Sequence, residues 1–432
     1  MKIFRGQEVK VSIEDVTTVK KKVIVNFPKE TVNEELRKEL LKIQKTAEIK
    51  GFRKGKAPYS IVEKIYMPEA MRRYAERIIK ESLENITTEN QLDIATRPII
   101  EKEDFTEGGF EYHAIIEVHP KVELNKYKDL TIKKQKINVT EEMIDSTLKE
   151  MKEKNYQLED IADSEKSDQS SVVTFDVLEY KLDGEYIGKF DNEVVDLTKG
   201  TIFNDLKESL IGCGVGEIKE VAFVYPENME DEKLRGKKAE LKIMIKKISK
   251  KVYPDDNELA KKMNFEDISA LREDIKKNIE IRLSKEIEDK FRVELFNKIA
   301  QENPFEVPEG MVDEMAIKML EDFMRNLEKA GLDPSNMNLD WKNMFEANKK
   351  SAEHILKRHY ILKALKEKEK LEVTDEELEN RISEIIEKSQ DKERASAYLA
   401  NPNVRRNIYM DMLENKIVEF LIANNQIEVV EE

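Results

Sequence analysis

One run of apolar side chains constrains the fold of this chain more than any other feature. Between residues 271 and 299 an apolar residue stands at every fourth position, namely Leu271, Ile275, Ile279, Leu283, Ile287, Phe291, Leu295 and Ile299. An α-helix has about 3.6 residues per turn, so this spacing drifts by about 40° at each step. We therefore predict one long helix whose apolar stripe winds around its axis and meets different neighbours along its length.

The remainder of the C-terminal part carries further signals of helix ends. The pairs Asn303-Pro304 and Val307-Pro308 end the long helix, and Pro308 suits the first turn of the next one. Residues 374–377, Thr-Asp-Glu-Glu, fit a capping box before another helix, and Pro402 precedes the last one. We predict an all-helical domain over residues 251–432.

The first 118 residues alternate between strand and helix periods. Strands are indicated near residues 9–13 and 23–27 and again at 110–118, and helices at 36–43 and 71–86. The residues that mark these periods are Val9, Val11, Ile13, Val23, Val25, Phe27, Leu36, Leu40, Ile43, Met71, Tyr74, Ile78, Ile79, Ile86, Phe110, Tyr112, Ala114, Ile116 and Val118. We predict a β-α-α-β domain over residues 1–118.

The middle of the chain contains a connector and a β-rich domain. In the connector, residues 119–160, Thr140 is a suitable N-cap for a helix that we expect to pack with the C-terminal domain. The polar stretch 160–171 is typical of a linker. Over residues 161–250 alternating strands and the hairpin signal Asp183-Gly184 predict a β-rich domain. The predicted fold class is therefore α+β multidomain.

Charge is distributed unevenly along the 432 residues. The chain has 75 basic and 90 acidic residues, a net charge of −15. Residues 1–118 hold 22 basic and 21 acidic side chains, so the remainder holds 75 − 22 = 53 basic and 90 − 21 = 69 acidic ones. Eight of the basic residues gather within positions 36–56: Arg37, Lys38, Lys42, Lys45, Lys50, Arg53, Lys54 and Lys56. This local patch could meet a polyanion, whereas the chain as a whole is unsuited to general nucleic-acid binding.

Composition also excludes several kinds of site. The single cysteine, Cys213, cannot form an internal disulfide and fits a reducing compartment. The spacing of the four histidines does not suit a metal site, and the stretch Gly212–Glu217 lacks the residues of a phosphate loop. We expect no metal, no cofactor and no membrane span, and a cytoplasmic location.

The segment 51–58, Gly-Phe-Arg-Lys-Gly-Lys-Ala-Pro, has the properties of a docking loop. Gly51, Gly55 and Pro58 shape a short loop, and its tip displays Phe52 beside Arg53, Lys54 and Lys56. An exposed aromatic residue costs the free protein apolar solvation, and the cations can bind carboxylates or phosphates. On these grounds alone, an ordinary solvated loop and a docking site remain equally open.

The order of residues in this loop resembles a family signature. Gly-Phe-Arg-x-Gly-Lys-x-Pro is the pattern by which bacterial trigger factors dock at the ribosomal exit tunnel, and the chain matches every fixed position. The resemblance extends to the β-rich insert and to the helical region that begins with Pro-Glu-Gly-Met-Val-Asp-Glu at 308–314. It implies a ribosome-docking N-terminal domain, an FKBP-like insert and a helical chaperone domain with two arms.

The same resemblance implies partners and a function. Gly51, Phe52, Arg53, Lys54, Gly55, Lys56 and Pro58 would contact ribosomal RNA and a ribosomal protein at the exit. The protein would be an ATP-independent chaperone that holds nascent and unfolded chains, with a homodimer off the ribosome. An enzyme acting mainly as a prolyl isomerase on free proteins is the alternative, and a purely structural ribosomal scaffold is a third hypothesis.

The insert departs from the isomerase pattern of the family. Asp176, Phe203, Leu206 and Tyr225 are the residues that could line a proline pocket, but Val177 and a position near Met229 replace expected aromatics. Such a pocket accelerates amide rotation by binding the twisted amide. The resemblance therefore implies a prolyl isomerase whose activity is weak or lost.

A methionine stripe follows in the C-terminal domain. Met311, Met315, Met319, Phe323 and Met324 recur at helical spacing. Such a stripe is typical of a helix core, and methionine is also flexible enough to accept varied apolar client segments. Both interpretations remain open from the sequence.

Overall fold

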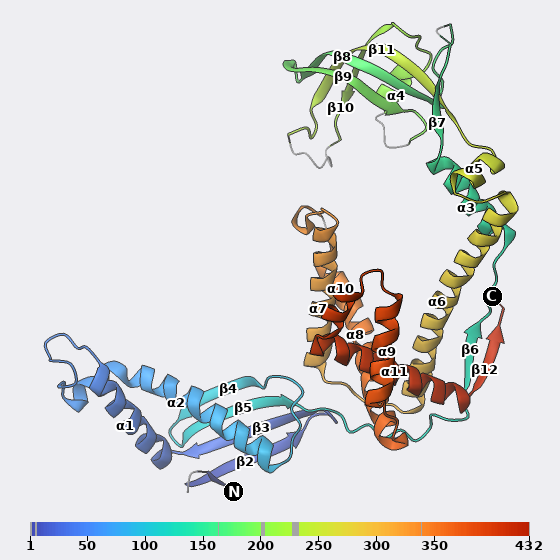
Figure 1. Cartoon of the computed structure of the whole chain (residues 1–432). Coiled ribbons are helices and arrows are strands. Elements are labelled where there is room, and N and C mark those ends of the chain that lie inside the picture. The colour runs from blue at the N-terminus through green and yellow to red at the C-terminus, as the bar shows by residue number, and fades with distance from the viewer. Residues whose placement is uncertain are drawn as a thin grey trace. The chain divides into compact units, whose positions relative to one another are not determined.

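The computed structural model describes residues 2–4, 7–162, 164–199, 204–226, 233–337 and 339–431. The chain forms two compact units (Figure 1). The first combines residues 1–134 with residues 291–430, and the second is built around residues 135–290. As predicted, the fold is α+β, with a β-rich middle and a helical C-terminal region.

The N-terminal domain is a five-stranded antiparallel sheet with two helices on one face. Its strands are β1 (Lys2–Phe4), β2 (Gln7–Asp15), β3 (Lys20–Pro28), β4 (Ile99–Thr106) and β5 (Gly109–Glu117), in the order β1-β2-β3-β5-β4. Helices α1 (Lys29–Thr46) and α2 (Tyr59–Glu89) supply the other layer. The predicted strands and helices are confirmed, whereas β1 and β4 were not predicted. The edge strand β4 is almost entirely exposed, so its sequence lacks the alternation that burial of one face produces.

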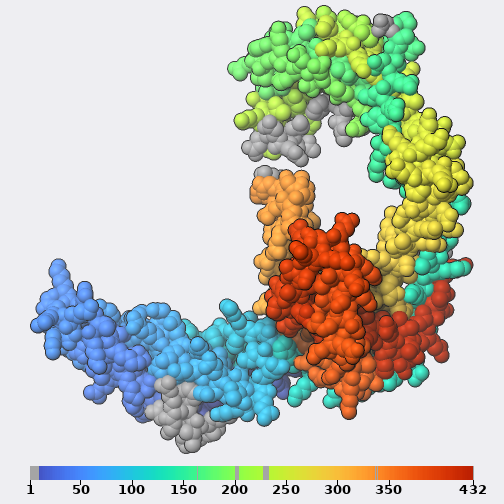
Figure 2. All heavy atoms as spheres, viewed as in Figure 1, coloured from blue at the N-terminus to red at the C-terminus, as the bar shows by residue number. Residues whose placement is uncertain are grey.

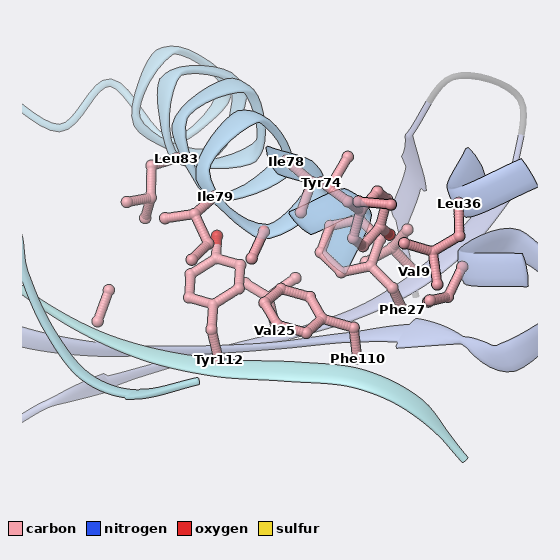
Figure 3. Close-up of a cluster of buried hydrophobic side chains, with 14 of the residues drawn as sticks. Val9, Val25, Phe27, Leu36, Tyr74, Ile78, Ile79, Leu83, Phe110 and Tyr112 are labelled. Carbon is pink, nitrogen blue, oxygen red and sulfur yellow. The ribbon is translucent and has the colours of Figure 1, made fainter. Parts of the chain in front are cut away.

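The core of this domain lies between the sheet and α2. Val25 and Phe27 of β3 face Tyr112 and Phe110 of β5 across the ladder. Figure 3 shows these side chains packed beneath α2, with Tyr74 directed into the same cluster. The Tyr112 hydroxyl lies 2.7 Å from the Ser82 hydroxyl, so this buried polar group is hydrogen-bonded. The alternation that marked the strands in the sequence is the alternation of this buried face.

The C-terminal region contains helices that pack around the end of α6. These are α6 (Ile268–Glu302), α7 (Glu309–Lys329), α8 (Trp341–Glu369), α9 (Asp375–Lys388), α10 (Lys392–Leu399) and α11 (Pro402–Ala423), with a short 3₁₀ turn at Pro334–Asn336. The capping box at Thr374 and Glu377 is confirmed. The region also ends in a strand that was not predicted, β12 (Gln426–Val430), which pairs with β6 (Thr131–Gln135) of the connector.

The winding stripe of α6 meets two different cores, as predicted. Leu271, Ile275 and Ile279 are buried with residues of α3 (Glu141–Lys154) and α5 (Asp256–Lys262). Farther along the helix, Phe291, Leu295, Phe296 and Ile299 are buried with residues of the connector, α8 and α11. The division of the chain into two units falls between these two sets, at Phe291.

The β-rich domain belongs to the second unit. Its strands are β7 (Gln157–Asp160), β8 (Ser171–Leu182), β9 (Glu185–Asp196), β10 (Ile218–Val224) and β11 (Lys238–Val252), with the short helix α4 (Asn204–Leu210). The sheet order is β10-β11-β8-β9, and β7 pairs with β11. The predicted hairpin at Asp183-Gly184 joins β8 to β9. Its core contains Val173, Phe175, Leu210 and Ile243.

The stretch predicted as a linker is part of this domain. Ser167 is buried, its hydroxyl donates to the Leu210 carbonyl at 2.6 Å, and it accepts from the Cys213 amide at 2.9 Å. Ser171 is fully buried at the start of β8. The interpretation as a linker was wrong because these polar residues make internal hydrogen bonds that composition does not reveal.

A glycine at the β4–β5 turn supplies a test of the N-terminal sheet. Gly109 has φ +131°, and a Cβ there would lie 1.9 Å from the Phe27 carbonyl oxygen. We expect Gly109→Ala to destabilise this domain by about 1–3 kcal/mol, because backbone strain and steric overlap act together. Hydrogen exchange of the β3 and β5 amides in the full chain measures the loss. Gly108→Ala is the matched control, since its Cβ would meet only Thr106 Oγ1 at 3.6 Å; equal exchange in both variants would contradict the prediction.

Candidate functional site

The candidate docking loop connects α1 to α2 and consists of two consecutive turns. The Phe52 amide donates to the Ile49 carbonyl at 3.0 Å, and the Lys56 amide donates to the Arg53 carbonyl at 2.9 Å. Gly51 and Gly55 adopt φ of +93° and +74°, which other residues rarely adopt. The two glycines of the motif therefore set the backbone path of the loop.

The base of the loop is attached to the domain. Gln44 of α1 donates its side-chain amide to the Ala57 carbonyl at 2.7 Å, which closes the loop across its two ends. Ala57 is buried, and Ala47 and Ile49 pack against the same core. A Cβ on Gly55 would lie 3.3 Å from the Lys45 carbonyl, so the loop also folds closely against the end of α1. Sequence reasoning missed Gln44, because nothing in the sequence relates it to Ala57.

The tip of the loop is exposed, as expected for a docking site. The loop projects from the end of the domain in both whole-chain views (Figure 1, Figure 2). Phe52 exposes 40% of its surface, and Arg53, Lys54 and Lys56 are exposed. Lys54 forms an ion pair with Glu48 at 3.2 Å. Among the residues that the structure describes, Arg53 and Lys56 have no such partner.

The cations of α1 fall into two groups that the sequence did not distinguish. Lys38 lies 2.8 Å from Glu34 and 2.9 Å from Glu35, and Lys42 lies 2.9 Å from Glu39. Arg37 and Lys45 are also exposed, and within the described part of the chain neither forms an ion pair. They stand eight residues apart, about two helical turns, with the exposed Leu41 between them. Lys50 is exposed as well and, among the same residues, forms no ion pair. We call Arg37, Lys45, Lys50, Arg53 and Lys56 the free cations.

A partly buried ion-pair network joins α1 to α2 beside these cations. The Arg77 guanidinium of α2 lies 2.9 Å from Glu35 and 3.3 Å from Glu39. Burial raises the pKa of the Glu35 carboxyl, but hydrogen bonds from Lys38 and Arg77 outweigh it and hold this pKa below its ordinary value. The network fixes the two helices that carry the loop, so the loop rests on a braced base.

The candidate isomerase residues lie in two kinds of surroundings, an apolar cluster and a polar network. Leu206 is buried and Tyr225 half-buried against one apolar cluster, where the Tyr225 hydroxyl lies 3.2 Å from that of Tyr180. Burial raises the pKa of Tyr225 well above its ordinary value. The Asp176 carboxylate instead accepts a hydrogen bond from the backbone N–H of Asn192 at 2.8 Å and forms an ion pair with Lys246 at 3.3 Å. Phe203 and Met229 lie outside the described residues. Among the described candidates, the structure places Leu206 and Tyr225 together in one cluster.

The methionine stripe lies along α7. Met311, Met315 and Met319 are half-buried against a small core formed with α8. Phe323 exposes 37% of its surface, and Met324 is half-buried. The first part of the stripe is thus attached to the core, whereas Phe323 near its end is exposed.

Other kinds of site can be assessed for the described residues. Within them, no group of three histidine, cysteine or acidic side chains could hold a metal ion, and no helix is long and apolar enough to cross a membrane. Cys213 is fully buried in the turn after α4, and burial raises the pKa of its thiol. Cys213 is buried in the stretch Gly212–Glu217 while Gly212, Val215 and Gly216 are exposed, so this stretch is a turn between α4 and β10.

Comparisons with known proteins identify the family. The model of the bacterial trigger factor protein matches residues 9–151, and that of the trigger factor C-terminus matches residues 267–423. The trigger factor of Geobacter sp. (strain M21) is 31% identical over 431 residues, covering 97% of this chain and 98% of the relative. That of Syntrophotalea carbinolica is 29% identical over 427 residues, covering 98% and 97%.

A solved structure of the trigger factor chaperone, studied for promiscuous substrate recognition in folding and assembly, also aligns with this chain. The alignment covers 95% of this chain and 98% of the other, with 18% identity and a TM-score of 0.48. From the two family models and the nearly full-length relatives, the chain belongs to the trigger factor family.

Proposed function

We propose that this protein is an ATP-independent chaperone that docks at the ribosomal exit tunnel and holds nascent chains in a foldable state. The observation that carries the proposal is the loop of residues 51–58, which displays Phe52 and several cations on a braced base. Its partners would be ribosomal RNA, a ribosomal protein at the exit, and nascent or unfolded polypeptides. A cytoplasmic location and a homodimer off the ribosome belong to the same proposal.

The proposal assigns roles to four parts of the chain. Residues 1–118 would bind the ribosome, and one hydrophobic core falls wholly between Val9 and Val118. Residues 119–160 would be the connector, and residues 161–250 the FKBP-like domain, whose core runs from Val173 to Ile248. Residues 251–432 would form the chaperone domain, with α6 in one arm and the α7–α8 pair in the other.

The docking surface would combine two kinds of contact. Phe52 offers apolar area at the tip of the loop, and exposed aromatic residues often anchor an interface. The free cations offer charge that no internal carboxylate neutralises, so they can bind phosphate without first breaking an ion pair. Lys38, Lys42 and Lys54 would contribute less, because an acidic neighbour already holds each of them.

Replacement of Phe52, Arg53 and Lys54 by alanine tests the loop. We expect ribosome affinity, measured by cosedimentation, to fall by at least about ten-fold, because the apolar anchor and two cations are removed together. Unchanged cosedimentation would contradict the assignment of the loop.

A matched pair of variants tests the distinction between the cations. In Arg37→Gln/Lys45→Gln, the slope of log affinity against log salt should decrease by roughly 0.7–0.9 for each phosphate group that the variant no longer binds. Lys38→Gln/Lys42→Gln removes the same charge from the same helix, and we expect a smaller change because these lysines are already paired. Equal slopes in the two variants would show that internal pairing does not decide which cations bind.

The helical domain would hold clients through the stripe of Met311, Met315, Met319, Phe323 and Met324. The far end of the stripe supports this role, since Phe323 is exposed while the first three methionines pack against the core. Methionine side chains adapt to apolar segments of varied shape.

The double variant Phe323→Ser/Met324→Ser tests this surface. We expect weaker suppression of aggregation of an unfolded client, with ribosome cosedimentation unchanged. Ile355→Ser is the control, because Ile355 is 43% exposed but lies on the neighbouring helix α8. An equal loss in the control would mean that any exposed apolar residue of the α7–α8 pair serves as well.

The insert carries a prolyl-isomerase-like domain by family resemblance, and we propose that its activity is weak or absent. The Asp176 carboxylate is engaged by Lys246 and the Asn192 amide, which opposes a role in orienting a client amide. Asp176, Phe203, Leu206 and Tyr225 remain the proposed pocket residues, with Val177 in place of an aromatic side chain.

A protease-coupled peptide assay on the full chain separates the proposal from an enzyme acting mainly on free proteins. We expect little isomerisation together with retained suppression of aggregation. Turnover at the level of a competent FKBP would favour the enzyme instead.

A further inference from the structure

A buried carboxylate of the N-terminal domain lies against the start of helix α7. Glu117, the last residue of β5, exposes only 6% of its surface. Its Oε2 accepts the Gly310 amide at 2.9 Å and the Thr96 hydroxyl at 2.9 Å, and Oε1 accepts the Gly310 amide at 3.2 Å. A carboxylate buried to this degree has a defined role, because burying a charge without partners is costly.

The first turn of α7 has no cap from its own segment. Its N-cap residue, Pro308, makes no side-chain hydrogen bond, and the first amides of any helix lack partners inside it. Glu117 supplies that acceptor from another part of the chain, and its negative charge faces the positive end of the helix dipole. The cap residue of α7 is therefore donated by the N-terminal sheet.

Gly310 is fitted to this contact. A Cβ at this position would lie 2.7 Å from Glu117 Oε2 and 3.0 Å from Thr96 Cγ2. No larger residue can allow the carboxylate to approach the helix amide this closely. The glycine is thus explained by close approach, since the structure gives it no positive φ.

Two further contacts lie near this cap. Glu306, three residues before α7, accepts the Thr18 amide at 3.1 Å and the Thr18 hydroxyl at 2.7 Å, in the turn between β2 and β3. His119 Nδ1 lies 2.7 Å from the hydroxyl of the buried Tyr360, which donates to Met311 Sδ at 3.2 Å. The N-terminal domain thus contacts the segment just before Gly310 directly, and the connector reaches Met311, just after it, through Tyr360 of α8.

We propose that Glu117 and Gly310 form an interdomain helix cap that positions α7 relative to the docking domain. Helix α7 is the one that carries Met311, Met315 and Met319, so the cap links the domain that would dock to the helix that would bind clients. The cap positions α7 whatever the loop binds. Its consequence for nascent chains rests on the proposed function.

Distance measurements on the free, full-length protein test the cap. Spin labels are placed on the exposed positions Asn33→Cys and Ala347→Cys, in α1 and α8, with the buried Cys213→Ser. Glu117→Ala and Gly310→Ala should each raise the population outside the native distance by roughly ten-fold, because each breaks a hydrogen bond to a charged group. Glu117→Gln keeps an acceptor oxygen for the Gly310 amide and should restore part of the native population.

Glu309→Gln is the matched control for charge at the same helix end. Glu309 is exposed, and among the described residues its one ion pair is a long contact with Lys20, at 3.7 Å. The distance distribution of the Glu309→Gln variant should therefore match that of the unaltered protein. A distribution unchanged by both Glu117→Ala and Gly310→Ala would overturn the proposal. So would an equal change in Glu309→Gln, since the effect would then be general electrostatics.

Hydrogen exchange separates positioning from loss of stability. If the cap only positions α7, exchange in β3 and at the buried end of α6 stays unchanged in the variants while the distances spread. Faster exchange in both of these cores would overturn the positioning role in favour of general destabilisation. Because ribosomes are absent from both measurements, failure of the cap and failure of the docking proposal remain distinguishable.

Discussion

The apolar stripe of helix α6 is divided between two hydrophobic cores, and the organisation of the chain depends on that division. Leu271, Ile275 and Ile279 complete a core with α3 and α5, whereas Leu295 and Ile299 complete one with α8 and α11. A stripe with a strict spacing of four cannot remain on one face of a helix with 3.6 residues per turn. One continuous helix can therefore supply buried side chains to two separate units.

A second constraint acts at the docking loop, because its tip side chains must be exposed while its backbone keeps one conformation. The tip residue Phe52 is kept out of the core, but the loop is closed by the hydrogen bond from Gln44 to Ala57 and braced by Arg77 between α1 and α2. Preorganisation lowers the entropy cost of binding. Glu35 and Glu39 of the same network also pair with Lys38 and Lys42. Fewer cations are therefore available to bind phosphate than the number of basic residues at 36–56 indicates.

The contacts around Gly310 connect one domain to the next. The N-cap residue of α7, Pro308, makes no side-chain hydrogen bond, and a carboxylate at the end of β5 supplies the missing acceptor. The energy of one such cap is modest, but it is directional, so it favours one placement of α7 on the sheet. The proposed function needs the docking loop and the client-binding stripe of α7 to keep a defined relative position. Directional polar contacts such as this cap can fix that position.

The sequence by itself determined the elements that repeat with a clear period. Strands β3 and β5, helices α1 and α2 and the long helix α6 all follow from alternation or helical spacing, because burial of one face imposes that pattern. The hairpin at Asp183 follows from its Asp-Gly turn signal. The loop of residues 51–58 was identified from its residue order. The exposed edge strand β4 and the terminal strand β12 were not predicted. A strand without a buried face shows no alternation of apolar and polar residues in its sequence. The pairing of Lys38 and Lys42 with carboxylates three or four residues away was open to the sequence too, because such neighbours meet on any helix. Only the tertiary structure decided how Gln44 closes the loop, that Ser167 is buried, and that Glu117 reaches Gly310. Each of these depends on groups that are separated in sequence and meet only after folding, where distance and burial determine the energy of a polar contact.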